Sequence, residues 1–355
     1  MIAPLDWGLG HATRCMPIID LLLSKGHRVI IAGNGDSFYL LKEQYPALKS
    51  YELPGYNISY PAGKNASFYA LLQTPKILNT IQEENKTITH ITEQERIDLI
   101  ISDNRYGVRH HSIRSILICH QIALQAPYAA RLMNPVFLKL HLRQIEKFDA
   151  LWIPDEEGVE NLSGKLSHGI SFNIVATYIG IQSRFAHLTK KDSFVDELDF
   201  SILVVLSGQE PQRAHLENEL RNKLKEHAEK ILLVQGKTEI QTIVREGNIT
   251  TVSYLNTNDL FAALQKARKI ICRSGYSSIM DLAVLGKKAI FIPAEGQTEQ
   301  EFLADMMEEK GFAVQCSAKA LNIGEALRKL ESCRGFPALP VSDERLRKAI
   351  ENALI

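Results

Sequence analysis

Short apolar runs rich in β-branched residues alternate with helix-like stretches along the whole chain. Such alternation is typical of parallel α/β structure, in which each strand is followed by a helix. The expected strands of the first half are Ile2–Leu5, Arg28–Ala32, Leu48–Leu53, Leu99–Ser102, Ile116–His120, Leu151–Pro154 and Ile174–Ala176. Those of the second half are Ser201–Leu206, Lys230–Gln235, Thr250–Ser253, Lys269–Cys272, Lys288–Ile292 and Ala313–Gln315. The two series predict two doubly wound sheets.

A polar stretch, "SRFAHLTKKDSFVDELD", separates the two series of strands and is expected to contain a hinge. At 355 residues the chain is long enough for two domains of ordinary size. The last part begins with a proline-rich stretch and continues as a helix for which Ser342 is the expected cap. The predicted parts are a first domain over 1–177, a linker over 178–199, a second domain over 200–335 and a crossing segment with a helix over 336–355.

Charge and cysteine content exclude several classes of protein. Lys plus Arg and Asp plus Glu both number 41, and this balance disfavours a nucleic-acid partner. The five cysteines are scattered without a CxxC pair, so neither a zinc site nor a disulfide framework is indicated. There is no signal-like segment and no apolar run long enough to span a bilayer. A reduced, cytoplasmic compartment is expected, and the short first strand suggests that a residue or two precede it.

The first stretch that could carry chemistry is "LDWGLGHATRCMPIIDLL". Here Gly8–Thr13 is the predicted turn between a strand and a helix, and such a turn directs backbone N–H groups and the positive end of the helix dipole at one point. His11 lies at the carboxyl end of a strand, where open α/β sheets bind ligands. The glycine pattern is imperfect for a dinucleotide, because Thr13 takes the last glycine position and the second strand ends on Gly33 without an acidic residue. A nicotinamide cofactor is therefore disfavoured, and a helix-capping role is the alternative for His11.

A second stretch, "KIICRSGYSSIMDLAVLGKKAIFIPAEGQTEQE", reads as strand, glycine turn, helix, strand and loop. Ser274 and Gly275 would lie at a helix N-terminus, which suits a diphosphate. The carboxylate of Asp281 can accept hydrogen bonds from a ribose diol, and the amides and carboxylates after the next strand suit a sugar. A third glycine turn, "LSGQEPQR", follows the first strand of the second series. Ordinary surface loops with capped helices are the alternative for both stretches.

Three stretches, "GLGH", "CRSGYSSIMDLAVLGKKAIFIP" and "YALLQTPKILNTIQEENKTI", resemble the MurG-type UDP-N-acetylglucosamine transferases of glycosyltransferase family 28. The resemblance spans most of the chain. It implies the GT-B fold, in which two Rossmann-like doubly wound α/β domains face each other across a cleft, the first for the acceptor and the second for the donor. It further implies an inverting hexosyltransferase that moves a hexosyl or N-acetylhexosaminyl group from a nucleotide sugar, UDP-linked, to a hydroxyl acceptor of a cell-envelope glycan.

The resemblance also implies site residues. His11 falls at the reacting centre, where it would be the general base. The implied donor residues are Arg184, Gly208, Gln209, Leu255, Ser274, Gly275, Tyr276, Ser277, Asp281, Gln300 and Glu301. Three of these depart from the family pattern: Asp281 replaces a glutamate, Glu301 replaces a glutamine and Leu255 replaces an aromatic residue that touches uracil. The acceptor candidates follow strands of the first series and are Gly8, Gly10, Asp103, Asn104, Arg105, His120 and Gln121.

No D-x-D pair occurs in the sequence, so neither a metal ion nor another cofactor is expected. Helix N-termini and Arg184 would stabilise the leaving diphosphate instead. Two other functions stay open, a nucleotide-sugar hydrolase or epimerase and a non-catalytic nucleotide-sugar-binding protein. The stretches "SFYALLQTPKILNTI" and "RLMNPVFLKLHLR" combine apolar stripes with basic flanks. They predict either peripheral contact with the inner face of a membrane and a lipid-linked acceptor, or the core faces of two helices.

Overall fold

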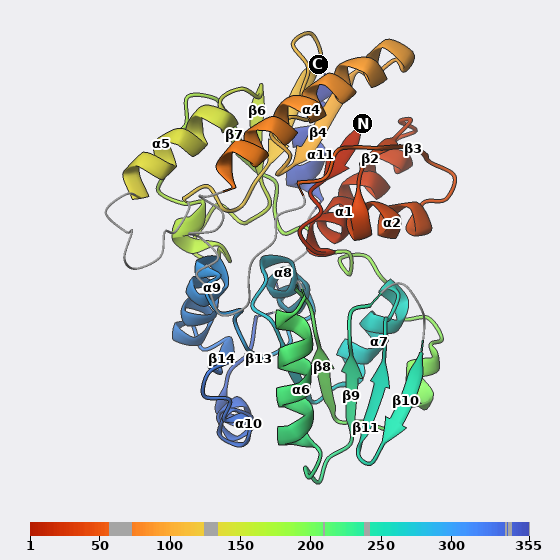
Figure 1. The fold of residues 1–355 in the computed structure, drawn as a ribbon, viewed down its shortest axis with the longest axis vertical. Helices are drawn as coiled ribbons and strands as arrows, with labels where there is room; N and C mark the ends of the chain where they lie inside the picture. Colours follow the sequence, from red (N-terminus) through yellow and green to blue (C-terminus); the bar gives the residue numbers. More distant parts are fainter. Residues whose placement is uncertain are drawn as a thin grey trace. The chain divides into compact units, whose positions relative to one another are not determined.

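The computed structural model describes residues 1–56, 73–123, 134–208, 210–237, 242–337, 339 and 343–354. It divides into two compact units, which are both visible in Figure 1. Unit 1 contains Met1–Ser183 and Val341–Ile355, and unit 2 contains Arg184–Pro340. Each strand expected from the sequence is present, seven of them in the sheet of unit 1, so the prediction of two doubly wound α/β domains is confirmed.

Unit 1 is built on a sheet of seven parallel strands in the order β3-β2-β1-β4-β5-β6-β7. The order reverses between β1 and β4, and their carboxyl ends mark the switch point at which open α/β sheets bind ligands. Both central strands are buried throughout, as expected for a parallel sheet covered on both faces. The strands are β1 (Ile2–Pro4), β2 (Ile30–Gly33), β3 (Lys49–Glu52), β4 (Leu99–Asp103), β5 (Arg114–Ile118), β6 (Ala150–Ile153) and β7 (Val175–Tyr178).

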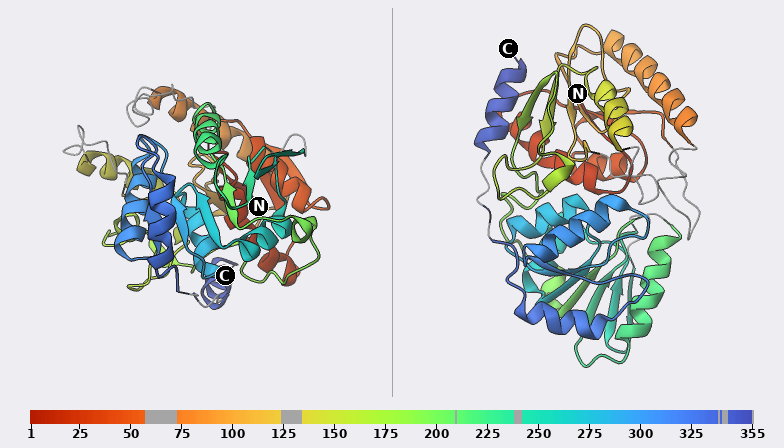
Figure 2. Two further views of the ribbon diagram at one scale, coloured as in Figure 1. Left: turned by 90° about the horizontal axis from the view of Figure 1, so that it is seen from below. Right: turned by 90° about the vertical axis from the view of Figure 1, so that its left-hand side faces the viewer.

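The helices of unit 1 are α1 (Gly10–Ser24), α2 (Gly35–Gln44), α4 (Thr74–Gln94), α5 (Asn134–Ile145) and α11 (Glu344–Leu354). Although α11 comes from the end of the chain, it lies beside α1 (Figure 1, Figure 2), and Nζ of Lys25 pairs with Glu351 at 2.5 Å. None of the helices in the described ranges combines the length and the apolar character that crossing a bilayer requires.

α1 begins earlier than predicted. The backbone N–H of Thr13 donates to the carbonyl of Leu9 at 3.0 Å, and its hydroxyl donates to the carbonyl of Gly10 at 3.0 Å. Helical hydrogen bonding therefore starts directly after Leu9, and the expected turn over Gly8–Thr13 is shorter than predicted. As a result His11 lies in the first turn of the helix.

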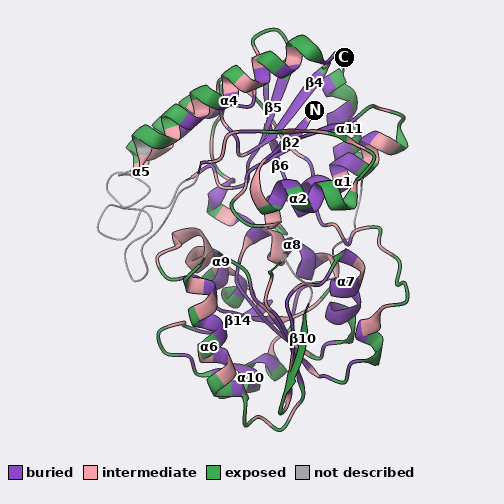
Figure 3. Ribbon diagram, turned by 45° about the vertical axis from the view of Figure 1, so that its right-hand side comes forward, coloured by how far each residue is buried: buried purple, intermediate pink, exposed green. Residues whose placement is uncertain are grey.

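Unit 2 has a second seven-stranded sheet, in the order β10-β11-β9-β8-β12-β13-β14. Its switch point lies between β8 and β12. All pairings are parallel except that of β10 with β11. The strands are β8 (Ile202–Val205), β9 (Ile231–Val234), β10 (Ile243–Glu246), β11 (Ile249–Val252), β12 (Lys269–Cys272), β13 (Ala289–Phe291) and β14 (Ala313–Gln315). The sequence did not predict β10, because every residue of this edge strand is exposed (Figure 3) and it lacks a buried apolar run.

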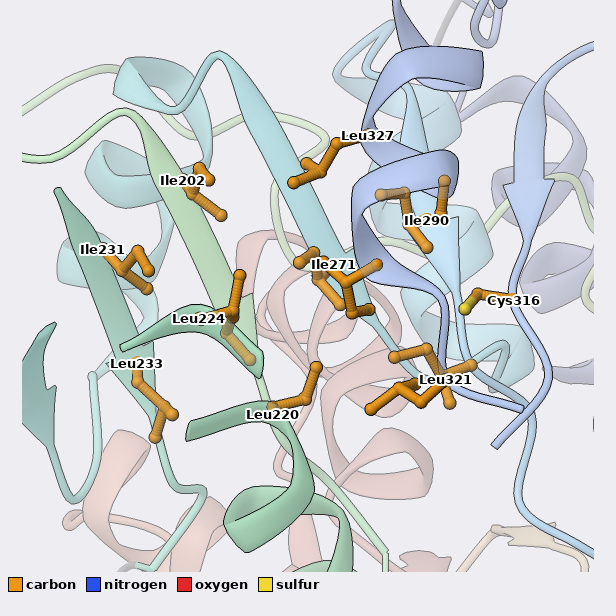
Figure 4. Close-up of a cluster of buried hydrophobic side chains, with 14 of the residues drawn as sticks. Ile202, Leu220, Leu224, Ile231, Leu233, Ile271, Ile290, Cys316, Leu321 and Leu327 are labelled. Atoms are coloured by element: carbon orange, nitrogen blue, oxygen red, sulfur yellow. The ribbon is translucent and has the colours of Figure 1, made fainter. Parts of the chain in front are cut away.

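The helices of unit 2 are α6 (Gln212–Leu224), α7 (Thr257–Lys266), α8 (Tyr276–Val284), α9 (Thr298–Glu309) and α10 (Ile323–Ser332). Figure 4 shows how α6 and α10 cover one face of the sheet: Leu220 and Leu224 from α6 and Leu327 from α10 lie over strand residues such as Ile271 and Ile290. The two helices thus bury one face of the sheet, and a ligand can bind at the loops that follow its strands.

Residues 184–199, expected as part of the linker, pack within unit 2. The hydroxyl of Ser193 donates to Oδ1 of Asp259 at 2.6 Å. Nζ of Lys266 donates to the carbonyl of Asp196 at 2.8 Å. The polar composition of this stretch indicated a solvated hinge, but its polar groups instead hold it against α7.

Candidate functional site

Four polar side chains meet at the carboxyl ends of β4 and β5: His11, Arg14, Asp103 and His120. Nε of Arg14 donates to Oδ2 of Asp103 at 2.5 Å, and Nη2 of Arg14 donates to Oδ1. Nδ1 of His11 lies 3.0 Å from Oδ1 of Asp103 and 2.8 Å from Nη2 of Arg14. Nη1 of Arg14 donates to Nδ1 of His120 at 2.9 Å. The switch point of unit 1 therefore holds an Arg–Asp ion pair between two imidazoles.

Burial and charge set the ionisation of this group. The side chains of Arg14 and Asp103 are 2% and 0% exposed, and that of His11 is 14% exposed. Burial by itself would raise the pKa of Asp103, but the charge of Arg14 and the contact with His11 hold it well below its usual range. Burial, followed by the charge of Arg14, lowers the pKa of His11. Near neutral pH, Asp103 is therefore a carboxylate and His11 is a neutral imidazole.

The pair of His11 and Asp103 has the chemistry of a general base. If Nδ1 of His11 carries its proton and donates it to Asp103, Nε2 keeps an unshared electron pair. A carboxylate in this place fixes the tautomer and stabilises the imidazolium that forms when a hydroxyl is deprotonated. Asp103, which was predicted as an acceptor contact, is fully buried and instead orients His11.

Asn104 directly follows β4 and has a φ of 56°, a left-handed conformation that asparagine adopts more readily than most residues and that also occurs at functional sites. Its Oδ1 is buried and has no hydrogen-bond donor among the described residues. A ligand hydroxyl could supply that donor, which is compatible with the predicted acceptor role of Asn104.

The other predicted acceptor residues near this edge of the sheet are Gly8, Gly10, His120 and Gln121. Gly8 has a φ of 92°, and its carbonyl accepts a hydrogen bond from Ser37 at 3.0 Å. Gly10 is the first residue of α1. His120 is buried beside Arg14, and Gln121 follows it in a half-buried position. All four predicted residues lie in loops or at a helix start at the carboxyl edge of the sheet.

Arg105 has a structural role in place of the predicted contact with an acceptor. Its side chain is fully buried, and Nε donates to Oε1 of Glu84 at 2.7 Å. Nη1 donates to Oδ1 of Asn34 at 2.7 Å, and Nη2 donates to the carbonyl of Pro54 at 2.6 Å. The hydroxyl of Tyr56 completes the cluster by donating to Oε2 of Glu84 at 2.7 Å. The guanidinium ties the loops after β2, β3 and β4 to α4 and is shielded from any ligand.

In unit 2, the structure brings together two predicted donor residues that are far apart in the sequence. Nε of Arg184 lies 3.7 Å from Oδ2 of Asp281, and the two side chains are 11% and 12% exposed. The guanidinium of Arg184 lies 5.0 Å from the ring centroid of Phe185, which packs against Phe261. Nε of Arg184 is buried without a hydrogen-bond acceptor in the described part of the chain. A nearly buried guanidinium whose Nε–H has no acceptor suits an anionic ligand.

The turn between β12 and α8 supplies the adjoining helix N-terminus. Gly275 is the N-cap in an extended conformation and provides no side-chain cap, and Ser277 is half-buried in the first turn of α8. Ser274 is fully buried, and its hydroxyl donates to the carbonyl of Gln300 at 2.7 Å. Tyr276 is also buried. Ser274 and Tyr276 therefore support the turn through their side chains, so any donor contact of theirs is left to the backbone.

Gln300 and Glu301, predicted to bind the donor sugar, lie in the first turn of α9 and hydrogen-bond back to the loop between β13 and α9. Oε1 of Gln300 accepts from the N–H of Ala294 at 3.0 Å, and Nε2 donates to Gln297 at 2.6 Å. Oε1 of Glu301 accepts from the N–H of Gly296 at 3.1 Å. These bonds shape the loop, and contact with a sugar stays a prediction for both residues.

Three predicted donor positions remain: Leu255, Gly208 and Gln209. Leu255 is only 2% exposed and packs in the core, so its side chain is not available to a nucleotide base. It precedes Asn256, which caps α7, and this turn directs Leu255 inward. Gly208, with a φ of 104°, ends the described part of the loop after β8, and Gln209 lies outside the described residues.

Sequence reasoning did not single out Arg14 or Glu84 as partners of the predicted residues. The signal for Arg14 was present, since it is a cation one helical turn after His11 on an otherwise apolar face. Glu84 gave no such signal, because it lies in a polar stretch of α4. Among the residues that the structure describes, no group of three or more His, Cys, Asp and Glu side chains could hold a metal ion.

Residues 202–347 match the model of the glycosyltransferase family 28 C-terminal domain. This match covers most of unit 2. Over 132 residues, or 34% of this chain and 36% of the relative, it is 31% identical to the UDP-N-acetylglucosamine--N-acetylmuramyl-(pentapeptide) pyrophosphoryl-undecaprenol N-acetylglucosamine transferase of Alkaliphilus metalliredigens (strain QYMF). The chain thus spans about a third of the length of this curated relative. The resemblance predicted from the sequence is confirmed.

Solved structures extend the likeness in fold to both units. The glycotransferase of kitacinnamycin superposes with a TM-score of 0.64 at 16% identity, over 100% of this chain and 98% of its own. Phytolacca americana UGT2, in a complex with UDP-2fluoro-glucose and pterostilbene, superposes with a TM-score of 0.62 at 16% identity, over 99% and 93%. At these identities the comparison shows the fold, which is that of GT-B glycosyltransferases.

Proposed function

We propose that the chain is an inverting, metal-independent glycosyltransferase that moves a hexosyl or N-acetylhexosaminyl group from a UDP-sugar to a hydroxyl acceptor. Unit 2 binds the donor, and unit 1 supplies the base and contacts the acceptor. The family 28 domain over 202–347 supports the donor role of unit 2. UDP as the nucleotide is supported by the name of the Alkaliphilus relative and by the ligand of the Phytolacca structure.

The observation that carries the proposal is the pairing of Arg184 with Asp281 beside the N-terminus of α8. A nucleoside diphosphate offers the hydrogen-bond acceptor that Nε of Arg184 lacks, and it offers a ribose diol to the carboxylate of Asp281. The helix N-terminus adds backbone donors and a favourable dipole. Together these groups stabilise a diphosphate as it departs, without a metal ion.

Transfer then proceeds as one displacement. The acceptor hydroxyl attacks the anomeric carbon, the bond from that carbon to the diphosphate oxygen breaks, and Nε2 of His11 takes the hydroxyl proton. Attack from the face opposite the leaving group inverts the anomeric configuration. Asp103 stabilises the imidazolium that results, since its carboxylate accepts from Nδ1 of His11.

A panel of nucleoside diphosphates and nucleotide sugars tests the donor site by thermal shift. Ligand at 100 times its Kd stabilises the folded state by about 2.7 kcal/mol, so we expect UDP and UDP-sugars to raise the Tm of the full chain. Asp281→Ala should weaken UDP binding by about tenfold or more, because it removes a charged acceptor of ribose hydrogen bonds. Asp305→Ala, an exposed change on α9, is the matched control and should respond like wild type.

Two results of that panel contradict part of the proposal, and two results of a turnover assay favour another function. No response to any nucleotide excludes the donor site, and an equal response from Asp281→Ala excludes the ribose contact. Steady release of nucleoside diphosphate without an acceptor favours the hydrolase. Binding without release under any acceptor panel favours the non-catalytic binding protein.

We further propose that the acceptor is lipid-linked and that α5 touches a membrane surface. Within the second predicted stripe, Leu138 and Leu142 pack against the core of unit 1, whereas Val136 and Leu140 are 51% and 50% exposed. The exposed pair alternates with the basic, exposed residues 139 and 143 on one face of the helix. In the first stripe, Ile77 and Ile81 pack against the cluster of Leu5 and Tyr56, and Leu78 is 46% exposed. The remaining stripe residues, within 67–72 and 131–133, lie outside the described ranges.

Vesicle flotation tests this surface. We expect the full chain to float with vesicles that contain anionic lipid and the double variant Val136→Glu/Leu140→Glu to remain at the bottom, because apolar insertion and charge attraction are both weakened. The control Val175→Glu changes a similarly exposed apolar residue on β7 and should float like wild type. Equal flotation of all three proteins would contradict membrane contact by α5 and would not affect the proposed donor site.

A further inference from the structure

Arg14 is a buried cation in unit 1 that the displacement described above does not use. Its guanidinium donates twice to Asp103, which is fully buried, and once to Nδ1 of His120. Nη2 of Arg14 also lies 2.8 Å from Nδ1 of His11, the same nitrogen that faces Asp103. Since a guanidinium stays charged at any working pH, Asp103 has a permanent counter-ion.

A buried carboxylate beside an imidazole, with no other cation, would hold a proton on that imidazole. An uncompensated buried charge is costly, and the protonation of His11 would relieve that cost. His11 would then begin each cycle as a cation, which cannot accept the proton of a hydroxyl. Because the double hydrogen bond from Arg14 already compensates the charge of the Asp103 carboxylate, His11 does not need to be protonated.

We propose that Arg14 is a positioning residue: as the permanent counter-ion of Asp103 it keeps His11 uncharged at neutral pH, so that the ring can accept a proton. The inference rests on the proposed function for its purpose, because it explains how His11 is kept ready as a base. Its physical content, the charge state of His11, is measurable without any substrate.

The charged and titratable groups that face His11 come from three elements. Arg14 lies on the same helix, Asp103 ends β4 and His120 follows β5. The thiol of Cys15 lies 3.6 Å from Oδ2 of Asp103 and, being buried, stays protonated. Arg14 disfavours a positive charge on His11, and Asp103 favours one. Removing Arg14 should therefore raise the pKa of His11, and removing Asp103 should lower it.

Histidine-labelled full-length protein tests the proposal by NMR, with the His11 ring assigned by its loss in His11→Ala. In wild type we expect the midpoint of His11 titration to lie below the ordinary histidine value of about 6.5. In Arg14→Gln it should rise by about one pH unit or more, because His11 becomes the only cation beside Asp103. Arg14→Lys keeps the charge and should remain near wild type. Arg28→Gln, an exposed arginine paired with Glu95, is the control and should show no change.

An unchanged or lower midpoint in folded Arg14→Gln overturns the proposal. If that variant does not fold, the wild-type titration still decides, since a His11 midpoint above about 7 would leave the ring charged at neutral pH and overturn the proposal. Failure of the proposed function is a separate result, namely no nucleotide binding or full transfer activity in His11→Ala. The NMR outcome depends on neither.

Discussion

Replacing His11 by alanine should lower kcat for sugar transfer by about a hundred- to ten-thousandfold while nucleotide binding stays unchanged. The size of the loss is that of a general base removed from the transition state. Nucleotide binding is spared because the proposed donor residues, Arg184 and Asp281, belong to unit 2. The measurement is the initial rate of product formation at saturating donor, beside a thermal shift with UDP.

His111→Ala is the matched control for that variant. Its ring is exposed and contacts His110 in the loop after β4, so its removal changes histidine content without touching the Arg–Asp pair. We expect a rate within about twofold of wild type. A His11→Ala enzyme that transfers at the wild-type rate contradicts the base role. The account would then keep the donor site in unit 2 and lose the mechanism.

The second large effect is on stability. Asp103→Ala should destabilise unit 1 by about 3 to 5 kcal/mol, because it leaves the guanidinium of Arg14 buried without its counter-ion. Both tryptophans of the chain, Trp7 and Trp152, lie in unit 1, and Trp152 is buried in β6. Tryptophan fluorescence during urea unfolding therefore reports unit 1 separately from unit 2.

Two further variants are controls for the loss of stability in Asp103→Ala. Asp98→Ala removes an exposed carboxylate that lies 3.8 Å from Arg96, and such surface changes cost at most about 0.5 kcal/mol. Arg14→Met/Asp103→Leu replaces the buried pair by apolar side chains and should recover most of the lost stability, since apolar replacements of buried ion pairs are often neutral. A full loss in the double variant would show that packing, rather than the uncompensated charge, dominates.

The sequence was a good guide to the strands and a poor guide to pairing between polar side chains. Buried parallel strands are continuous apolar runs, so their positions are readable locally. β10 was not predicted, because an exposed edge strand has no such apolar run. Contacts such as Arg14 with Asp103, 89 residues apart, depend on strand order, and composition or spacing does not give that order.

Arg105 and Leu255 show the same limit on predicting site residues. An arginine after a strand can bind a ligand or can compensate a buried carboxylate, and only the position of Glu84 decides between the two. Leu255 precedes a helix cap, and its inward orientation follows from the turn. Arg184 and Asp281, by contrast, were predicted separately, and the structure brings them together within 3.7 Å.

The central claim is that the chain transfers a sugar from a nucleotide sugar with inversion. The most direct test is an NMR assay of full-length protein with UDP-sugars and a panel of hydroxyl acceptors, in which the anomeric configuration of the product is determined. The account predicts acceptor-dependent product of inverted configuration from wild type and almost none from His11→Ala. Product of retained configuration, or free sugar formed at the same rate with and without acceptor, would contradict it.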